Sequence, residues 1–165
     1  STFSLEDGAS NSLIMQTSIG QGDTLVTPMH MAMIASSICN DGECMMPYII
    51  DSIQNDEGTL VEQYEEESYG NILTSVQADE LETYMRYVVT DGTASKLQSD
   101  LYEAFGKTGS AEYNSNKDET HSWFVGYAKS GDKEIAVAVV LEGAGSGSSY
   151  AVPVAKTMFD TYFGY

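Results

Sequence analysis

The chain has 165 residues, of which 42% are hydrophobic, and its 25 acidic residues against 7 basic ones give a net charge of −18. This length and composition are typical of one globular domain with a core of its own, and they exclude a disordered chain or a coiled coil. The charge excludes a nucleic-acid binder and a binder of anionic membrane surfaces, because both ligands would repel the chain.

Residues 1–26 are predicted to be an irregular lead-in, since they are rich in Ser, Gly, Asn and Gln and show little periodicity. A helix is predicted to begin at Thr27-Pro28, with Thr as N-cap and Pro in the first helical position. Apolar residues cover this helix on nearly all sides, so we expect it to be buried and to end at Asn40-Asp41-Gly42. Cys39 and Cys44 flank that turn, and their spacing is compatible with a disulfide or with two free thiols.

The middle of the chain predicts a β-hairpin and a second helix. Two short segments, Tyr48 to Gln54 and Thr59 to Tyr64, flank the turn Asn55-Asp56-Glu57-Gly58 and are typical of a hairpin. Thr74 and Gln77 fit a capping box at the start of the helix, and Gly92 is expected to end it. The buried face of the helix is expected to carry apolar residues at helical spacing: Leu81, Tyr84, Met85 and Val88.

Three strands are predicted next, at Phe105 to Tyr113, Ser122 to Lys129 and Glu134 to Leu141. The turn Ser130-Gly131-Asp132 makes the last two strands antiparallel. The third strand has no polar alternation, which indicates a central strand covered on both faces. A closing helix is predicted from Ala151 to Phe163. The order predicts an α/β (α+β) fold: an antiparallel sheet with packed helices, the closing helix on one face and the Thr27 helix on the other.

One strand carries an unusual motif, Gly106-Lys107-Thr108-Gly109-Ser110-Ala111-Glu112. A lysine on a strand between glycines can reach a substrate carboxylate or a neighbouring hydroxyl. Glycine lets a ligand approach the backbone closely, and free N–H groups there can hold a developing oxyanion. The three letters Lys-Thr-Gly alone are also compatible with an ordinary edge strand.

The motif resembles the Lys-Thr-Gly motif of the penicillin-recognising serine enzymes, with Ser110 in place of a threonine. Further segments are similar to class B penicillin-binding proteins and occur in the same order: Ser18 to Gly22, Thr27-Pro28, Asn40-Asp41-Gly42, Val88 to Ala94, and Ser122 to Ala128, after which Lys129 replaces a proline. From about residue 12 to 165 the chain resembles the C-terminal part of the transpeptidase domain of such a protein, a peptidoglycan D,D-transpeptidase. The resemblance implies a penicillin-binding-protein/β-lactamase-like fold.

The resemblance also implies roles for individual residues. Lys107 would take part in the proton network of the serine in the family's second motif, Ser-x-Asn, and would attract the terminal carboxylate of the substrate. Thr108 and Ser110 would hydrogen-bond to that carboxylate. The backbone N–H of Ser110 would supply half of the oxyanion hole, and Gly109 would stay small so that the acyl chain can lie along the strand. Trp123 is better interpreted as a core residue.

The implied ligands are peptidoglycan stem peptides ending in D-Ala-D-Ala and β-lactam antibiotics, with no metal or organic cofactor. The two histidines, His30 and His121, match no metal-ligand spacing. The implied location is the extracytoplasmic face of the bacterial cell membrane. No stretch reaches the roughly 18 apolar residues of a transmembrane helix, and no signal peptide opens the sequence, so we expect the anchor of the parent protein to lie outside it.

The family's nucleophilic serine is not found in this sequence. The family's nucleophile motif, Ser-x-x-Lys, should precede Lys-Thr-Gly, but the one Ser-x-x-Lys here, Ser130 to Lys133, follows it and falls in a hairpin turn. Tyr69-Gly70-Asn71 resembles a variant of the second motif, but it lies after the segment Ser18 to Gly22, where the family has no such motif. We therefore expect 1–165 to be the C-terminal portion of a single transpeptidase domain, a fragment that is inactive alone. Its parts would be a lead-in (1–26), a helical and hairpin region (27–104), and a sheet with a closing helix (105–165).

The missing part of the sheet would leave the strand at 134–141 unpaired on one side, so self-association through this strand is also expected. Three other interpretations remain open from the sequence. The same fold and motif occur in serine β-lactamases and β-lactam sensors, and in non-catalytic interaction domains. The glycine-rich segment Gly143 to Gly147 suggests a nucleotide site, although its spacing does not fit the dinucleotide fingerprint.

Overall fold

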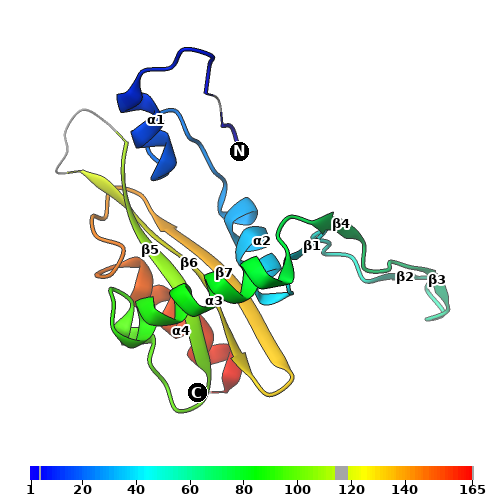
Figure 1. Cartoon of the computed structure of the whole chain (residues 1–165). Helices are drawn as coiled ribbons and strands as arrows, with labels where there is room; N and C mark the ends of the chain where they lie inside the picture. The colour runs from blue at the N-terminus through cyan, green and yellow to red at the C-terminus, as the bar shows by residue number, and fades with distance from the viewer. Residues whose placement is uncertain (4, 114–118, 165) are drawn as a thin grey trace.

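A three-stranded antiparallel sheet forms the centre of the chain (Figure 1), in a computed structural model that describes residues 1–3, 5–113 and 119–164. Its strands are β5 (Glu103–Glu112), β6 (Thr120–Ser130) and β7 (Lys133–Leu141), in the order β5-β6-β7. The prediction of an antiparallel sheet with three C-terminal strands is confirmed.

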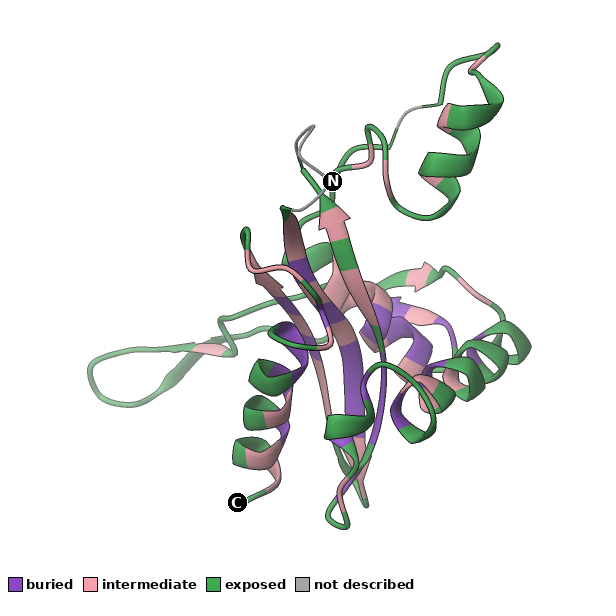
Figure 2. Cartoon of the chain, turned by 90° about the vertical axis from the view of Figure 1, so that its left-hand side faces the viewer, coloured by how far each residue is buried: buried purple, intermediate pink, exposed green. Residues whose placement is uncertain are grey.

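Two helices cover opposite faces of this sheet, as predicted (Figure 2). Helix α4 (Ala151–Phe163) places Phe159 against Phe124 in one core cluster. Helix α2 (Pro28–Cys39) places Ile38 in a second cluster with Phe105 and Tyr127. Since a strand points successive side chains to opposite faces, Phe124 and Tyr127 of β6 belong to different faces, and each helix buries its own.

Helix α2 begins as the sequence predicts, because the hydroxyl of Thr27 accepts a hydrogen bond from the N–H of His30 at 3.2 Å. The prediction that this helix is buried on nearly all sides was wrong. The buried residues are Ala35, Ser37 and Ile38, while Met29 in the first turn is exposed. The helix packs against the sheet, α3 (Ser75–Thr90) and β1 (Glu43–Met45), which leaves its first turn exposed and its other apolar residues half-buried or buried.

Helix α3 (Ser75–Thr90) has the predicted capping box between Thr74 and Gln77. The predicted buried face was only partly right: Met85 is buried, but the other two buried positions are Ala78 and Val89. Tyr84 instead lies in solvent and donates its hydroxyl to Glu80 at 2.8 Å. The small Ala78 allows close packing, a factor that a search for large apolar residues misses.

Strand β7 lies at one edge of the described sheet, with β6 between its neighbours, which agrees with the expectation that the strand at 134–141 is unpaired on one side in this chain. The prediction that β7 is covered on both faces is confirmed, since α2 and α4 both pack against it. Cover on both faces explains its continuous apolar sequence. Within the described residues, the backbone on its outer side has no strand partner.

The remaining elements lie outside the central sheet. The predicted hairpin forms from β2 (Ser52–Gln54) and β3 (Leu60–Gln63), and it projects from the body (Figure 1). At its base, β1 (Glu43–Met45) pairs with β4 (Ser68–Asn71), a pairing not predicted from sequence. A short 3-10 helix, η1, spans Ser95–Leu97.

Residues 11–18 also depart from the prediction of an irregular lead-in. They form α1 (Asn11–Ser18), capped by the Ser10 hydroxyl, which accepts from the N–H of Leu13 at 3.2 Å. Helix α1 buries none of its residues, and a helix without a buried face does not need the apolar periodicity by which helices are predicted from sequence. Cys39 and Cys44 are both free thiols, which answers the question of a disulfide.

Candidate functional site

The strand with the Lys-Thr-Gly motif, β5, is the other edge of the sheet. It pairs with β6 in a regular antiparallel register that sets Lys107 opposite Val125 and Gly109 opposite Trp123. The side chain of Lys107 is exposed, and its Nζ donates to the backbone oxygen of Thr108 at 2.6 Å. Among the described residues no carboxylate lies within ion-pair distance of Lys107. In a molecule of net charge −18, this cation is available to an anionic ligand.

The hydroxyl of Thr108 is held by a residue that the sequence analysis did not single out. Thr93 Oγ1 and Thr108 Oγ1 lie 2.7 Å apart and share a hydrogen bond. Thr93 follows the end of α3, where the N–H of Ala94 donates to the oxygen of Val88 at 3.0 Å. A Cβ at Gly92 would lie 2.8 Å from that same Val88 oxygen, so the turn needs glycine there. The turn after α3 therefore sets the hydroxyl of Thr93 against the motif.

The loop between β7 and α4 packs onto the motif from one face of the sheet. Gly147 lies so close to the β5–β6 pair that a Cβ there would be 2.5 Å from the oxygen of Gly109 and 2.4 Å from that of Trp123. Its N–H donates to Ser110 Oγ at 3.4 Å. The buried Ser122 fixes the loop: its hydroxyl donates to the oxygen of Ser146 at 2.9 Å and accepts from the N–H of Ala151 at 3.0 Å.

This packing gives the glycine-rich segment Gly143 to Gly147 a role other than nucleotide binding. Close approach of one backbone to another is a common reason for glycine. The segment connects β7 to α4, and among the described residues the central sheet has no parallel strand to complete a dinucleotide-binding unit. Gly147 therefore lets the loop pack directly against the motif strand.

A cavity of about 310 Å³ adjoins the motif. Lys107, Thr108, Gly109 and Ser110 form one wall of it. The rest of its lining includes the segment Ile19 to Gln21, Met31 of α2, and Trp123 and Val125 of β6. Three segments that resemble the same family in sequence, namely the motif, Ser18 to Gly22 and Ser122 to Ala128, thus contribute to one cavity. Its lining is mostly apolar with a few polar groups, as is usual for a ligand site.

A second cavity of about 680 Å³ continues along the same face of the sheet. Trp123 lines both cavities and is half-buried, so the expectation of a purely core tryptophan was wrong. Tyr113 and His121 stack at the far end of this second cavity, with ring centroids 4.1 Å apart. Thr24 lines both cavities, and its Oγ1 is buried without a hydrogen-bond partner within the part of the chain that the structure describes.

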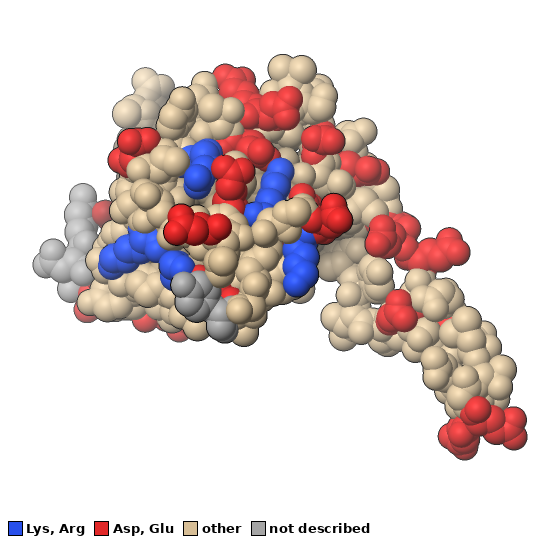
Figure 3. Space-filling view, turned by 90° about the horizontal axis from the view of Figure 1, so that it is seen from below, with Lys and Arg blue, Asp and Glu red and all other residues tan. Residues whose placement is uncertain are grey.

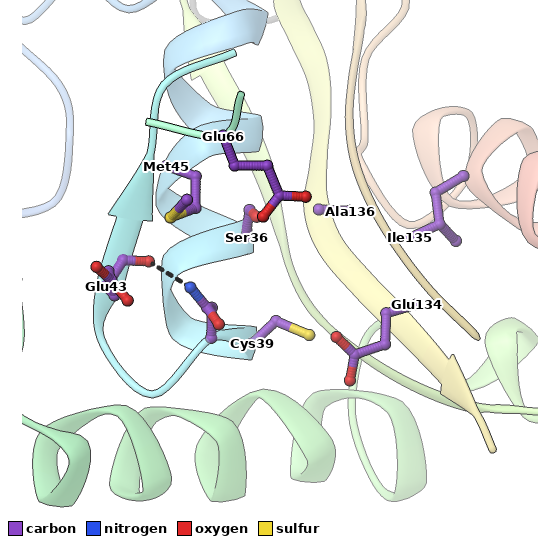
Figure 4. A pocket seen from close by; sticks show the side chains of 9 residues that line it. Ser36, Cys39, Glu43, Met45, Glu66, Glu134, Ile135 and Ala136 are labelled. Atoms are coloured by element: carbon purple, nitrogen blue, oxygen red, sulfur yellow. Dashed lines mark hydrogen bonds between the residues drawn. The ribbon is translucent and has the colours of Figure 1, made fainter. Parts of the chain in front are cut away.

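Another hollow, of about 420 Å³, lies at the β7 edge (Figure 4). Cys39, Glu134 and Glu66 line it, and Asn40 donates to the backbone oxygen of Glu43 at 3.2 Å. Burial raises the pKa of the Cys39 thiol to about 12, so at neutral pH it is protonated and is a poor nucleophile. No group of three metal-ligating side chains occurs among residues 1–3, 5–113 and 119–164. Among the described residues this hollow therefore offers neither a reactive thiol nor a metal site, and the Lys107 cavity is the better candidate.

The two sequence matches interpreted as coincidental lie on other elements. Ser130 and Lys133 pair with each other across the β6–β7 turn, whereas Lys107 pairs with Val125 in the middle of β6. Asn71 ends β4, in the ladder at the base of the projecting hairpin. Both matches therefore lie on strands or their turn, and neither lines the Lys107 cavity.

Comparison with known proteins identifies relatives over most of the chain. Residues 2–160 match the family described as "Penicillin binding protein transpeptidase domain". The chain is 33% identical over 163 residues to the peptidoglycan D,D-transpeptidase MrdA of Haemophilus influenzae, a match that covers 87% of this chain and 25% of that protein. It is 29% identical to the peptidoglycan D,D-transpeptidase PbpA of Mycolicibacterium smegmatis, covering 85% of this chain and 30% of that protein.

Solved structures agree with this comparison. The D,D-transpeptidase domain of a peptidoglycan glycosyltransferase from Eggerthella lenta superposes with a TM-score of 0.73 at 30% identity, covering 84% of this chain and 33% of that one. Penicillin-binding protein A of M. tuberculosis, solved as an imipenem acyl-enzyme complex, gives a TM-score of 0.79 at 26% identity, covering 88% and 32%. The chain thus spans between a quarter and a third of the length of these proteins.

Proposed function

The chain belongs to the penicillin-binding protein transpeptidase domain family, and we propose that it forms the Lys-Thr-Gly wall of a serine D,D-transpeptidase site. In the proposed reaction a serine hydroxyl attacks the D-Ala-D-Ala amide of a stem peptide, releases D-Ala and forms an acyl-serine ester. An amine of a neighbouring stem then attacks the ester and frees the serine. The observation that carries the proposal is an edge-strand lysine beside a cavity, without a carboxylate partner among the described residues.

Each motif residue has a proposed part in this chemistry. Lys107 attracts the terminal carboxylate of the stem peptide, or that of a β-lactam, and serves the proton network of a second-motif serine. The hydroxyls of Thr108 and Ser110 hydrogen-bond that carboxylate. Alternate residues of an edge strand direct their N–H groups away from the sheet, which supports the backbone of Ser110 as half of an oxyanion hole. Gly109 leaves room for the acyl chain.

The nucleophile is proposed to come from residues that this sequence does not contain. The one Ser-x-x-Lys of the chain, at Ser130 to Lys133, lies in a hairpin turn. We propose that residues 1–165 are the C-terminal portion of one transpeptidase domain and that they are inactive alone. The lead-in 1–26 and the sheet region 105–165 then contribute most of the cavity lining, and the helical and hairpin region 27–104 contributes Met31.

The proposed location is the extracytoplasmic face of the bacterial cell membrane, where peptidoglycan lies. Among the described residues no helix is long and apolar enough to cross a bilayer. The outer side of β7 is also proposed to pair with a second copy of the chain, because its backbone donors and acceptors have no strand partner in the described residues.

The proposal is tested by Lys107→Ala in a protein that carries this chain together with the nucleophile segment. Loss of the cation should lower the second-order rate of acylation by a fluorescent penicillin by about 100-fold, the size expected for an electrostatic group in the transition state. Lys133→Ala, an exposed lysine in the hairpin turn, is the matched control and should acylate normally. Equal rates for both variants would refute the role of Lys107.

A further inference from the structure

Residues 46–67 form an arm that projects from the body of the molecule, with the β2–β3 hairpin at its end (Figure 1). We call this segment the acidic arm. Every residue in it is exposed except Ser52, which is half-buried. All of its large apolar side chains are exposed: Met46, Tyr48, Ile49, Ile50, Ile53, Leu60, Val61 and Tyr64. Ile49 is the extreme case, with 97% of its surface accessible.

The acidic arm is ordered by hydrogen bonds and has no core. At its turn, Asn55 Oδ1 accepts from the N–H groups of Glu57 at 3.1 Å and Thr59 at 2.8 Å. Nearer the base, Gln63 Nε2 donates to the oxygen of Asp51 at 2.9 Å. An isolated two-stranded ribbon is marginally stable in water, and its apolar surface stabilises it only when that surface is covered. Such an exposed apolar surface is typical of an interaction site.

The charge of the acidic arm limits what can cover it. Between residues 46 and 67 there are seven acidic residues and no Lys, Arg or His. Figure 3 shows carboxylates along the arm and at its tip, whereas Lys and Arg side chains lie on the body. A partner with positive charge around an apolar surface is complementary to this pattern. An anionic lipid surface and the acidic arm of a second copy would both be repelled.

We propose that the acidic arm docks onto a partner protein whose apolar groove is rimmed by lysine and arginine. Exposed apolar side chains of the arm, Ile49 and Val61 among them, enter the groove, and the carboxylates of 65–67 pair with cations of its rim. Apolar anchors at the centre and charged pairs at the rim are the usual division of labour in protein interfaces. No residue of the acidic arm lines the Lys107 cavity, so this surface is independent of the proposed transpeptidation.

The test uses the complete chain, labelled with ¹⁵N, and a cationic amphipathic peptide of leucine and lysine as the probe. At physiological salt the peptide should shift amide resonances concentrated in residues 46–67. Ile49→Ser with Val61→Ser should weaken binding by about tenfold or more, as expected for interface anchors. Replacing Glu65, Glu66 and Glu67 by Gln should weaken binding less and should reduce its dependence on salt.

Two matched controls measure non-specific attraction to this acidic chain. Val76→Ser removes an equally exposed apolar residue (73% accessible) on α3, and Glu6→Gln with Asp7→Asn removes exposed charges near the N-terminus. Both should bind the peptide like the unchanged chain. Shifts spread over the whole surface, or losses equal to those of the controls, would overturn the proposal. Binding of phosphatidylglycerol vesicles through the arm, or a dimer that Ile49→Ser with Val61→Ser abolishes, would also overturn it.

Discussion

At the scale of residues, the hydrogen bond between Thr93 and Thr108 positions the motif. The two hydroxyl oxygens are 2.7 Å apart, and Thr93 is held by the turn after α3. A shared hydrogen bond fixes the direction of the Thr108 hydroxyl, which the proposed function assigns to the substrate carboxylate. Thr93 therefore acts through Thr108 and is a positioning residue.

Replacing Thr93 tests this role in a protein that includes the nucleophile segment. Thr93→Val keeps the shape of the side chain and removes the hydroxyl, so acylation by penicillin should slow by about tenfold, the value of one hydrogen bond of roughly 1.4 kcal/mol. Thr93→Ser keeps the hydroxyl and should restore most of the rate. Thermal unfolding serves as the control and should be similar for both variants. Equal acylation by Thr93→Val and Thr93→Ser would show that the contact is not used.

At the scale of elements, the fit of the loop after β7 against β5 depends on one glycine. Gly147 lies on the backbone of Gly109 and Trp123 at distances that leave no space for a Cβ. The neighbouring Ser122 is fully buried, and its hydroxyl hydrogen-bonds both to the loop, at the oxygen of Ser146, and to the N–H of Ala151 at the start of α4. The loop therefore supports the motif strand from the face opposite α2.

Gly147→Ala should displace this loop and destabilise the fold by about 1–3 kcal/mol, the usual cost of overpacking. Urea unfolding of the complete chain measures the change. Ser149→Ala alters an exposed residue of the same loop and should leave the midpoint nearly unchanged. A Gly147→Ala midpoint equal to that of the control would mean that the loop moves away without cost.

Elements with strong local signals could be predicted from the sequence, and those set by distant neighbours could not. The capping box at Thr74, the turn between β6 and β7 and the bounds of α4 all follow from adjacent residues. The pairing of β1 with β4 and the contact of Thr93 with Thr108 join segments separated along the chain, and only the fold brings them together. The motif itself was recognisable because its residue types carry chemistry that a plain edge strand does not need.

At the scale of the whole molecule, the sheet has one edge that carries the motif and another that is unpaired within the described residues. The β7 edge is covered on both faces by α2 and α4, yet its outer backbone has no strand beside it. A strand from a second copy would satisfy these groups, but each copy carries a net charge of −18. Pairing at the edge and electrostatic repulsion therefore oppose each other.

This opposition predicts salt-dependent self-association. Salt screens repulsion between exposed charges, with a Debye length of roughly 10 Å at 0.1 M and 3 Å at 1 M. The dimer fraction, measured by sedimentation at tens of micromolar chain, should therefore rise from low to high salt. The arm variant Ile49→Ser with Val61→Ser should dimerise like the unchanged chain, because the contact lies at β7. A monomer at every salt concentration would contradict pairing through this edge.

The most direct test of the central claim is labelling with a fluorescent penicillin, followed by denaturing electrophoresis. The Lys-Thr-Gly wall is proposed to lie in this chain and the nucleophilic serine outside it. We therefore expect no labelled band for residues 1–165 alone, and a band for a protein that joins the chain to the nucleophile segment. A covalent adduct on the isolated chain, mapped to Ser130 or any other of its serines, would contradict the account.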